Sequence, residues 1–189
     1  MERVSAEPPD PRPRNAALAL GANLGDRESA IRFALDRLDA APGVALVAAG
    51  PVIETPAVGP GAQPHYLNTA GVVRTTLDAR DLLDLCLMIE QEAGRDRASE
   101  IRWGARVLDI DLLLFHDLVV DQPGLTVPHP RLHERLFVLG PLTQIAGDWR
   151  HPTLGLTIDE LFHAAENAER SASRRVQDRN RDRCQCGGA

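Results

Sequence analysis

The sequence contains no lysine, because all 21 basic residues of the 189-residue chain are arginines. This absence excludes three kinds of site: the lysine-bearing phosphate loop of many nucleotide-binding proteins, the Schiff base of pyridoxal enzymes, and a lysine general base. Any binding of anions therefore has to rely on arginine. The guanidinium group donates two parallel hydrogen bonds and so matches the geometry of phosphate oxygens.

Cysteines and long apolar runs are also scarce. The three cysteines, Cys86, Cys184 and Cys186, form neither a disulfide framework nor a zinc-binding spacing. A reducing compartment suits such a chain, so we expect a cytoplasmic protein. No apolar run approaches the roughly 20 residues that span a bilayer, and the start of the chain lacks the apolar centre of a signal peptide.

The size and charge of the chain limit its partners. A length of 189 residues, 43% of them hydrophobic and 25% charged, is typical of one globular domain. The formal net charge is −6, although the segment 167–183 carries six arginines and only three acidic residues. The remainder is therefore more acidic than the net charge indicates, the opposite of a nucleic-acid-binding domain. We expect small-molecule substrates, no nucleic-acid or membrane partner, and a monomer.

Hydrophobic periodicity predicts one folded domain over residues 16–166. The segments 1–15 and 167–189 lack this periodicity, and we expect a disordered extension and a disordered arginine-rich tail there. Between them the pattern predicts, in order, strand 16–21, a helix from Asp26, strand 44–54 interrupted at Gly50-Pro51, strand 66–76, a helix capped by Asp78 and closed by Gly94, strand 107–115, a return hairpin through 118–120, and a helix over 131–145.

The order strand, helix, strand, strand, helix, strand is that of a split βαβ unit. It predicts an α+β protein with a ferredoxin-like sandwich, in which helices cover a mainly antiparallel sheet, followed by extra C-terminal helices. The segment L-G-A-N-L-G-D (20–26) lies between the first strand and the first helix. Without a lysine, its glycines are interpreted as a strand-to-helix turn rather than a phosphate cradle.

Two aspartates interrupt the most hydrophobic stretch of the chain, R-V-L-D-I-D-L-L-L-F (106–115). Side chains alternate along a strand, so Asp109 and Asp111 share one face and lie about 6.6 Å apart along it, while Leu108 and Ile110 turn to the other face. Leaving two carboxylates buried and unpaired would cost roughly several kcal/mol. A positive partner is therefore required.

Two kinds of partner are compatible with this pattern. Arg102 or Arg106 would neutralise the aspartates in a structural ion cluster, whereas Mg²⁺ would bind both carboxylates and keep its other coordination positions for water and phosphate. The preceding loop carries four arginines, at positions 95, 97, 102 and 106, which exceed what two aspartates neutralise. This excess favours an additional anion, such as a nucleotide triphosphate with paired metal ions.

Five segments carry a resemblance to a known family: L-G-A-N-L-G-D (20–26), E-T-P-A-V-G-P-G-A-Q-P-H-Y-L-N (54–68), I-E-Q-E-A-G-R (89–95), R-W-G-A-R-V-L-D-I-D-L-L-L-F (102–115) and L-T-V-P-H-P-R-L-H-E-R-L-F-V-L-G-P-L (125–142). From about Ala17 to Leu161 the chain resembles the 6-hydroxymethyl-7,8-dihydropterin pyrophosphokinases of folate biosynthesis. The fourth segment is the most specific. The resemblance implies a Mg²⁺-dependent enzyme that moves the β,γ-diphosphate of ATP to the hydroxymethyl group of the pterin.

The resemblance also implies roles for individual residues. Asp109 and Asp111 match the ligands of two Mg²⁺ ions, and Arg95 and Arg106 match the arginines that act on the phosphates in catalysis. The positions that match ATP contacts are Glu90, Arg97, Leu112, Thr126, His129 and Arg135. The positions that match the pterin pocket are Thr55, Val58, Tyr66, Asn68, Trp103 and Phe137. In such a pocket aromatic faces stack on the flat ring, and an amide both donates and accepts hydrogen bonds.

The chain departs from the family pattern at three places. Gly124 stands where relatives often carry a basic residue, Pro130 replaces an aromatic residue, and the loop from Gly94 to Trp103 is one residue longer than in some relatives. These differences concern the groups that hold the ATP phosphates, and they leave the identity of those groups open.

Other functions are also compatible with paired aspartates on such a sheet. A two-metal nucleotidyl transferase or nuclease is disfavoured by the acidic body of the chain, which offers no basic track. A ligand-sensing domain would have no use for two carboxylates facing four arginines. A zinc site at His129 and His133 is disfavoured because prolines on both sides of His129 place it before the helix.

Overall fold

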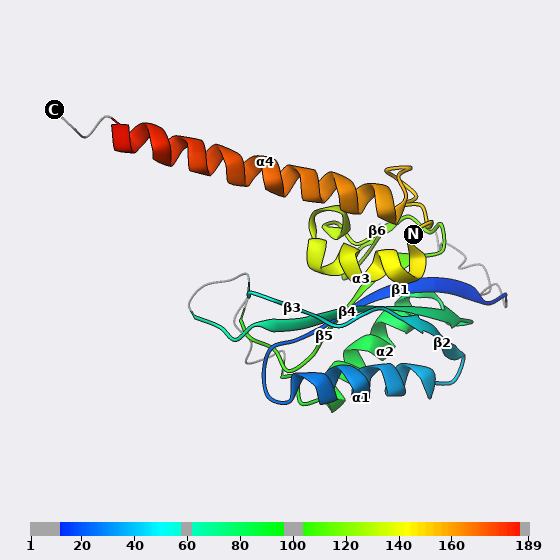
Figure 1. Ribbon diagram of the computed structural model, residues 1–189. Helices are drawn as coiled ribbons and strands as arrows, with labels where there is room; N and C mark the ends of the chain where they lie inside the picture. Colours follow the sequence, from blue (N-terminus) through cyan, green and yellow to red (C-terminus); the bar gives the residue numbers. More distant parts are fainter. Residues whose placement is uncertain (1–11, 58–61, 97–103, 186–189) are drawn as a thin grey trace.

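The computed structural model of the chain describes residues 12–57, 62–96 and 104–185, and the side chains of all of these except 176–185. Its elements follow in the order β1 (Arg14–Ala22), α1 (Arg27–Asp39), β2 (Val44–Ala49), β3 (Ile53–Thr55), β4 (Tyr66–Thr75), α2 (Ala79–Glu92), β5 (Asp109–Phe115), β6 (Val120–Gln122), β7 (Leu125–Val127), the 3₁₀ helix η1 (Leu132–Glu134), α3 (Leu136–Ala146) and α4 (Ile158–Gln185) (Figure 1).

The main sheet has the order β2-β4-β1-β5, with β3 also paired to β4. All of these neighbours are antiparallel, and β1 lies at the centre with Ala19 opposite Ala70 on one side and Asp111 on the other. This is the strand order of a split βαβ unit with one strand inserted between its parallel pair. The predicted α+β class and ferredoxin-like arrangement are confirmed.

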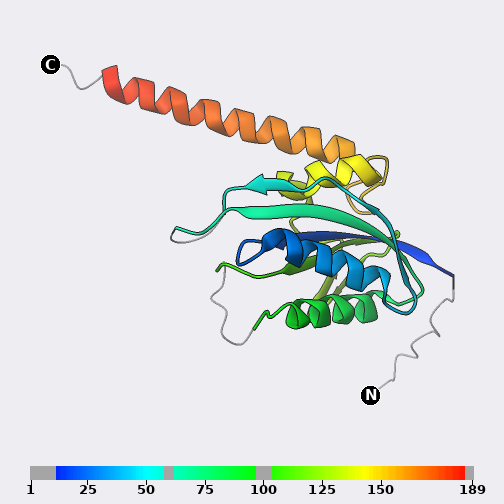
Figure 2. The same cartoon turned by 60° about the horizontal axis from the view of Figure 1, so that its bottom comes forward.

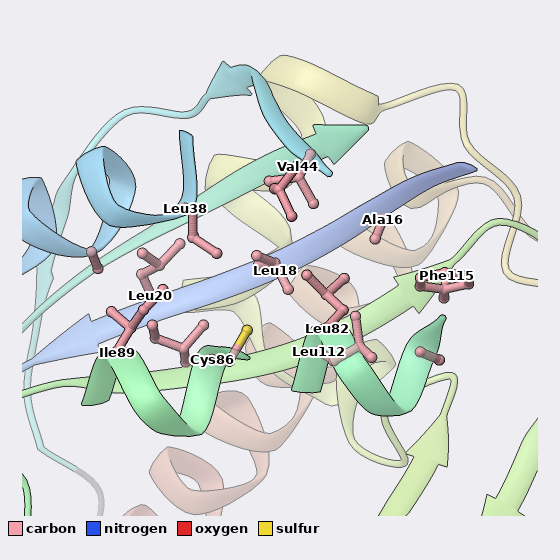
Figure 3. Close-up of a cluster of buried hydrophobic side chains, with 14 of the residues drawn as sticks. Ala16, Leu18, Leu20, Leu38, Val44, Leu82, Cys86, Ile89, Leu112 and Phe115 are labelled. Carbon is pink, nitrogen blue, oxygen red and sulfur yellow. The ribbon is translucent and has the colours of Figure 1, made fainter. Parts of the chain in front are cut away.

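Helices cover both faces of the sheet, with α1 and α2 on one side and α3 and α4 on the other (Figures 1 and 2). The alternation of β1 explains the two cores, because Leu18 and Leu20 pack toward α1 and α2 whereas Ala17 and Ala19 pack toward α3. Figure 3 shows the first of these cores. Burial there raises the pKa of the Cys86 thiol to about 12, so the group is neutral and inert at physiological pH.

The predicted helix starts and the first turn are confirmed. The side chain of Asp26 accepts a hydrogen bond from the backbone N–H of Ser29 at 3.1 Å, and that of Asp78 accepts one from Asp81 at 2.8 Å. Gly25, at φ 65°, makes the turn between β1 and α1, which is the interpretation given to L-G-A-N-L-G-D.

The predictions after β5 are partly wrong. The expected return hairpin does not form, because Val120 pairs with Val127 in a separate two-stranded sheet instead of with β5. The helix expected over 131–145 begins as the 3₁₀ turn η1 and is interrupted at Arg135, whose backbone is extended (φ −103°, ψ 91°), before α3 continues the chain. This break turns the Arg135 side chain toward β5.

The predicted disordered ends are wrong at their inner limits. Arg14 and Asn15 belong to β1, where they pair with Thr75 and Arg74. The tail expected from residue 167 is helical as far as Gln185, because the start of α4 is fixed on the second core by Leu161 and the following sequence contains no proline or glycine that would end a helix. Residues 1–11 and 186–189 lie outside the description. Within the described part of the chain, no helix is long and apolar enough to cross a membrane.

Candidate active site

Asp109 and Asp111 open strand β5 on the face of the sheet that α3 covers. Their side chains are about a quarter to a third exposed, at 23% and 32%, whereas Leu108 and Ile110 are buried on the opposite side. The predicted common face is therefore confirmed. Partial exposure matters here, because the two carboxylates remain accessible to a ligand in the cavity above the sheet.

Each of these aspartates has an arginine partner. Arg106 donates to Asp109 through Nη1 at 2.7 Å, and Arg95 bonds the other carboxylate oxygen of Asp109. Arg135 donates to Asp111 at 2.8 Å, and His129 Nε2 lies 3.9 Å from the same oxygen. The structure thus shows arginine partners for both aspartates, which was one of the two possibilities compatible with the sequence. The partner of Asp111 is Arg135, which lies at the break before α3 and not in the loop that precedes β5.

A third carboxylate, that of Glu90, is buried beneath the first two. Its Oε1 accepts a hydrogen bond from the backbone N–H of Ile110 at 2.7 Å and forms an ion pair with Arg95 Nη1 at 2.9 Å. Because β5 is an edge strand, this outward N–H has no neighbouring strand, and Glu90 takes the place of one. Arg95 also donates to Leu108 O at 3.3 Å, so it lies along the strand edge between Glu90 and Asp109.

The buried Glu90 adds a third carboxylate to the two that the sequence placed at this site. Among the described residues, three carboxylates meet three guanidinium groups, those of Arg95, Arg106 and Arg135. Arg97 and Arg102 lie outside the described residues, so the arginine excess expected from the sequence stays a prediction. The burial of Glu90 could have been predicted from the sequence. Leu82, Cys86 and Glu90 follow one another at intervals of four residues and so lie on the same buried face of α2.

The two aspartates fit a metal that brings other ligands with it. Within the described ranges, no group of three or more histidine, cysteine, aspartate or glutamate side chains forms a metal cage. An ion at Asp109 and Asp111 would hence have two carboxylates from the protein and would take its remaining ligands from water or phosphate. That is the usual manner of Mg²⁺ and unlike a zinc site.

A cavity of about 1220 Å³ opens above these carboxylates and brings together eight of the sixteen predicted site residues. The predicted residues that line it are Thr55, Tyr66, Asn68, Arg106, Asp109, Asp111, Arg135 and Phe137. The predicted residues that are described but do not line it are Glu90, Arg95, Leu112, Thr126 and His129. The predicted positions Val58, Arg97 and Trp103 lie outside the described residues, as does Arg102.

The part of the cavity lined by β4 has the polar and aromatic groups that a ring-binding pocket needs. Asn68 is buried, and its Nδ2 donates to Thr55 Oγ1 at 2.8 Å. Tyr66 is two residues earlier on the same face of β4, and its hydroxyl donates to Gly104 O at 3.3 Å. A side chain at Gly21 would come within 3.0 Å of Asn68 Oδ1, so the glycine keeps room for the amide. Asn68 is thereby held with both an amide donor and an amide acceptor near the cavity.

Three predicted ATP contacts do not line the cavity, and only His129 among them lies next to the paired aspartates. Leu112 turns its side chain into the core under α2, and Thr126 donates to Asp121 at 2.9 Å within the separate β6–β7 sheet. His129 lies beside Asp111, held by its backbone N–H donating to Leu113 O at 2.8 Å. Burial lowers the pKa of His129, and Arg135 lowers it further against the opposing effect of Asp111, so the ring is neutral at pH 7.

A sequence model of the family described as "7,8-dihydro-6-hydroxymethylpterin-pyrophosphokinase (HPPK)" matches residues 17–147. The chain belongs to the HPPK family. Two relatives named 2-amino-4-hydroxy-6-hydroxymethyldihydropteridine pyrophosphokinase illustrate the similarity. The Bacillus subtilis protein is 44% identical over 130 residues, which cover 69% of this chain and 77% of the length of that protein. The Pseudomonas aeruginosa protein is 42% identical over 147 residues, 78% of this chain and 89% of its own.

Solved HPPK structures have the same fold. A crystal structure of an HPPK-DHPS in complex with substrates superposes with a TM-score of 0.65 at 13% identity, over 85% of this chain and 45% of that one. The HPPK-DHPS of Plasmodium falciparum with pteroate gives 0.61 at 15% identity, over 81% and 42%. This HPPK family member thus spans less than half of those longer chains, and the likeness concerns the fold.

Asn23 is a residue of this HPPK site that the sequence reading missed. Its side chain is buried, its Oδ1 accepts a hydrogen bond from the backbone N–H of Arg106 at 2.6 Å, and its Nδ2 donates to Pro64 O at 3.2 Å. The backbone N–H of Asn23 donates to Arg106 O at 3.0 Å. One amide therefore links the segment that carries Arg106 to the segment that leads into Tyr66.

Replacing Asn23 by alanine should weaken both links at once. The buried N–H of Arg106 and the carbonyl of Pro64 lose their partner, so we expect a decrease of about 1–3 kcal/mol in the free energy of unfolding. Urea denaturation measures this change. Asn15→Ala is the matched control, since Asn15 is an exposed asparagine of β1, the strand that ends one residue before Asn23. Equal stabilities of the two variants would contradict the bridging role.

Replacing Glu90 by alanine should be far more destabilising. It removes the acceptor of the buried Ile110 N–H and one of the two carboxylates that pair with the buried Arg95 guanidinium, and breaking such a buried pair costs about 3–5 kcal/mol. Glu92→Ala, two residues later, removes only the exposed pair with Arg37 and should change stability little. Thermal and urea unfolding compare the two variants. Comparable decreases in the free energy of unfolding for both variants would refute the role of Glu90 as the partner of the β5 edge.

Proposed function

We propose that this protein transfers the β,γ-diphosphate of ATP to the hydroxymethyl group of 6-hydroxymethyl-7,8-dihydropterin, forming AMP and the pterin diphosphate for folate biosynthesis. The observation that carries the proposal is the composition of one cavity. Its lining combines the paired aspartates and their arginines Arg106 and Arg135 with an amide and two aromatic side chains. Family membership and the names of the relatives support the same reaction.

Asp109 and Asp111 would hold Mg²⁺ in the part of the cavity that receives the phosphates. The resemblance implies two such ions. The bound metal supplies positive charge that offsets the negative charge of the polyphosphate. The protein contributes position, because both carboxylates project from a strand whose edge Glu90 and Arg95 fix in place. Positioning and charge stabilisation are the main requirements of phosphoryl-type transfer.

Arg106 and Arg135 would change partners when the substrate arrives. Both bond the aspartates in the structure, at 2.7 and 2.8 Å, and both line the cavity. Once the carboxylates hold a cation, these guanidinium groups can turn to the phosphate oxygens and stabilise charge on the transferred group. Arg95 is buried more deeply, with only 3% of its side chain exposed. Its proposed catalytic role requires a larger rearrangement than that of Arg106.

For the second substrate, Asn68 and Thr55 would recognise the polar edge of the pterin, and Tyr66 and Phe137 would provide the faces against which the ring stacks. The hydrogen bond between Asn68 and Thr55 fixes the orientation of the amide before the pterin binds. Val58 and Trp103 are further proposed contacts from the two segments outside the described residues. We propose that the protein acts as a cytoplasmic monomer.

The product formed from ATP tests the proposal. Incubation with ATP, Mg²⁺ and the hydroxymethyl dihydropterin should yield AMP and the pterin diphosphate, which chromatography with mass detection resolves. Formation of ADP would indicate transfer of a single phosphoryl group instead. Absence of both nucleotides would favour the ligand-sensing alternative, and incorporation of nucleotide into a polymer would favour the nucleotidyl transferase.

The metal assignment is tested by Asp111→Asn. This change keeps the side-chain size but removes the charge that a Mg²⁺ ligand needs, so we expect turnover to fall by at least about 10³-fold without unfolding. Asp117→Asn is the control, because Asp117 is largely exposed outside the cavity. Activities would be measured alongside circular dichroism. Near-normal turnover in the Asp111 variant would refute the assignment.

The role of Arg106 is tested by the way a substitution divides between kcat and KM. If its guanidinium acts on charge that develops during transfer, Arg106→Ala should lower kcat by about 10²–10³-fold and leave the KM values nearly unchanged. Arg32→Ala, an exposed position on α1, is the matched control. A rise in the KM for ATP at constant kcat would instead assign Arg106 to ground-state binding.

A further inference from the structure

Arg27, the first residue of α1, bonds to both sides of the β3–β4 hairpin. Its Nη1 donates to Glu54 Oε1 at 2.7 Å and to His65 O at 2.7 Å. Glu54 belongs to β3 and His65 directly precedes β4, so the two acceptors lie on either side of the segment that connects these strands. One guanidinium group therefore ties the beginning of that segment to its end.

The carbonyl next to that of His65 is held from the same part of the molecule. Asn23 Nδ2 donates to Pro64 O at 3.2 Å, so two consecutive carbonyls accept hydrogen bonds from side chains at or just before the start of α1. The turn that carries Asn23 is fixed in its turn, because its backbone N–H donates to Arg106 O at 3.0 Å. The base of the hairpin is thus attached to a well-anchored support.

The side chains proposed to bind the pterin lie on the other side of the same two strands. Side chains alternate along β3, so Glu54 meets Arg27 of α1 whereas Thr55 lines the cavity. Thr55 is paired with Tyr66 in the register of the hairpin, and its Oγ1 accepts the hydrogen bond that orients the Asn68 amide, at 2.8 Å. Arg27 does not line the cavity and acts on these groups from behind the sheet.

Strand β3 needs such a support because it is short and lies at an edge. It has three residues, and within the described part of the chain it pairs with β4 and with no other strand. Short edge strands with few contacts open locally at little cost in free energy. A shift of β3 would move Thr55 away from Asn68, and the pterin would then have to order the free amide on binding.

Helix stability does not account for the position of Arg27. A cation in the first turn of a helix interacts unfavourably with the helix dipole, and Arg27 directly follows the N-cap. The two paired side chains are 30% and 51% exposed, and exposed ion pairs contribute little to the stability of a fold. The hydrogen bond from Arg27 lowers the pKa of Glu54, so this carboxylate is charged at neutral pH. What the contact provides is a fixed geometry of the hairpin.

We infer that Arg27 is a positioning residue for the pterin. By holding the two sides of the β3–β4 hairpin together from behind, it keeps Thr55, Tyr66 and Asn68 in the arrangement that binds the ring. The inference rests on the proposed function, since it gives Arg27 a part in the binding of the second substrate of that reaction. Both side-chain hydrogen bonds of Arg27 go to the hairpin, so the binding of ATP and the transfer step should depend on it little.

The test compares Arg27→Gln with Arg37→Gln in the full chain. Arg37 is a matched control on the same helix, because it also forms an exposed ion pair with two short contacts, to Glu92 at 2.8 and 3.0 Å, but its partner lies on α2. Arg27→Lys is the conservative variant, since an ammonium group can donate to both acceptors. Steady-state kinetics give kcat and the KM for each substrate, and mass spectrometry follows amide hydrogen exchange in β3.

Arg27→Gln should raise the KM for the pterin about tenfold and leave kcat and the KM for ATP within about twofold of the wild type. Amide exchange in β3 should become faster, whereas exchange in β2 should not change. Arg27→Lys should recover most of the increase in KM, and Arg37→Gln should behave as the wild type. Glu54→Ala should also raise the KM for the pterin, and combining it with Arg27→Gln should add little, because the two residues form one contact.

Several outcomes would overturn the inference. Equal KM values for the pterin in Arg27→Gln and Arg37→Gln would show that the contact does not act on the pterin site. A lower Tm together with parallel changes in kcat and in both KM values, not recovered by Arg27→Lys, would show a general structural role. Failure of the wild-type protein to form AMP would refute the proposed function and this inference together, whereas normal turnover with a pterin KM that is insensitive to Arg27 would refute the inference alone.

Discussion

The buried carboxylate of Glu90 is the interaction on which the rest of the site depends. Strand β5 is at the edge of the main sheet, and an edge strand presents backbone groups without partners. Glu90 accepts the outward N–H of Ile110 and pairs with Arg95, which in turn bonds the carbonyl of Leu108. The beginning of β5, with Asp109 and Asp111, is therefore held rigidly from the side opposite to the cavity.

This arrangement separates support from chemistry. The face under α1 and α2 is a conventional apolar core, and the buried polar groups there secure the strand edge. The opposite face leaves Asp109 and Asp111 partly exposed, with Arg106 and Arg135 as partners that a bound cation can release. Asn23 connects the two loop segments at the same end of the sheet, so the cavity walls are joined to each other as well as to the sheet.

Strongly patterned regions of the sequence were predicted well, and regions with competing signals were not. The alternation around Asp109 and Asp111 gave their common face, and the caps Asp26 and Asp78 gave the helix starts, because these features depend on neighbours within a few residues. The hairpin expected after β5 does not form, because Val120 pairs with Val127, a partner that follows it in the chain. Polarity alone predicts a disordered tail from residue 167, whereas the first turns of α4, which precede it, are packed on the second core and the helix continues from them.

The sequence by itself determined the class of the fold, the absence of lysine chemistry, the family resemblance and the shared face of two carboxylates. Only the tertiary structure decided which arginine meets which aspartate, that Glu90 is buried, that Asn23 bridges two segments, and that α4 lines the cavity. The physical reason is one of range. Periodicity and capping are set by local geometry, whereas all of these contacts except Arg106–Asp109 join residues far apart in the chain, and only the packing of the sheet between its helices brings them together.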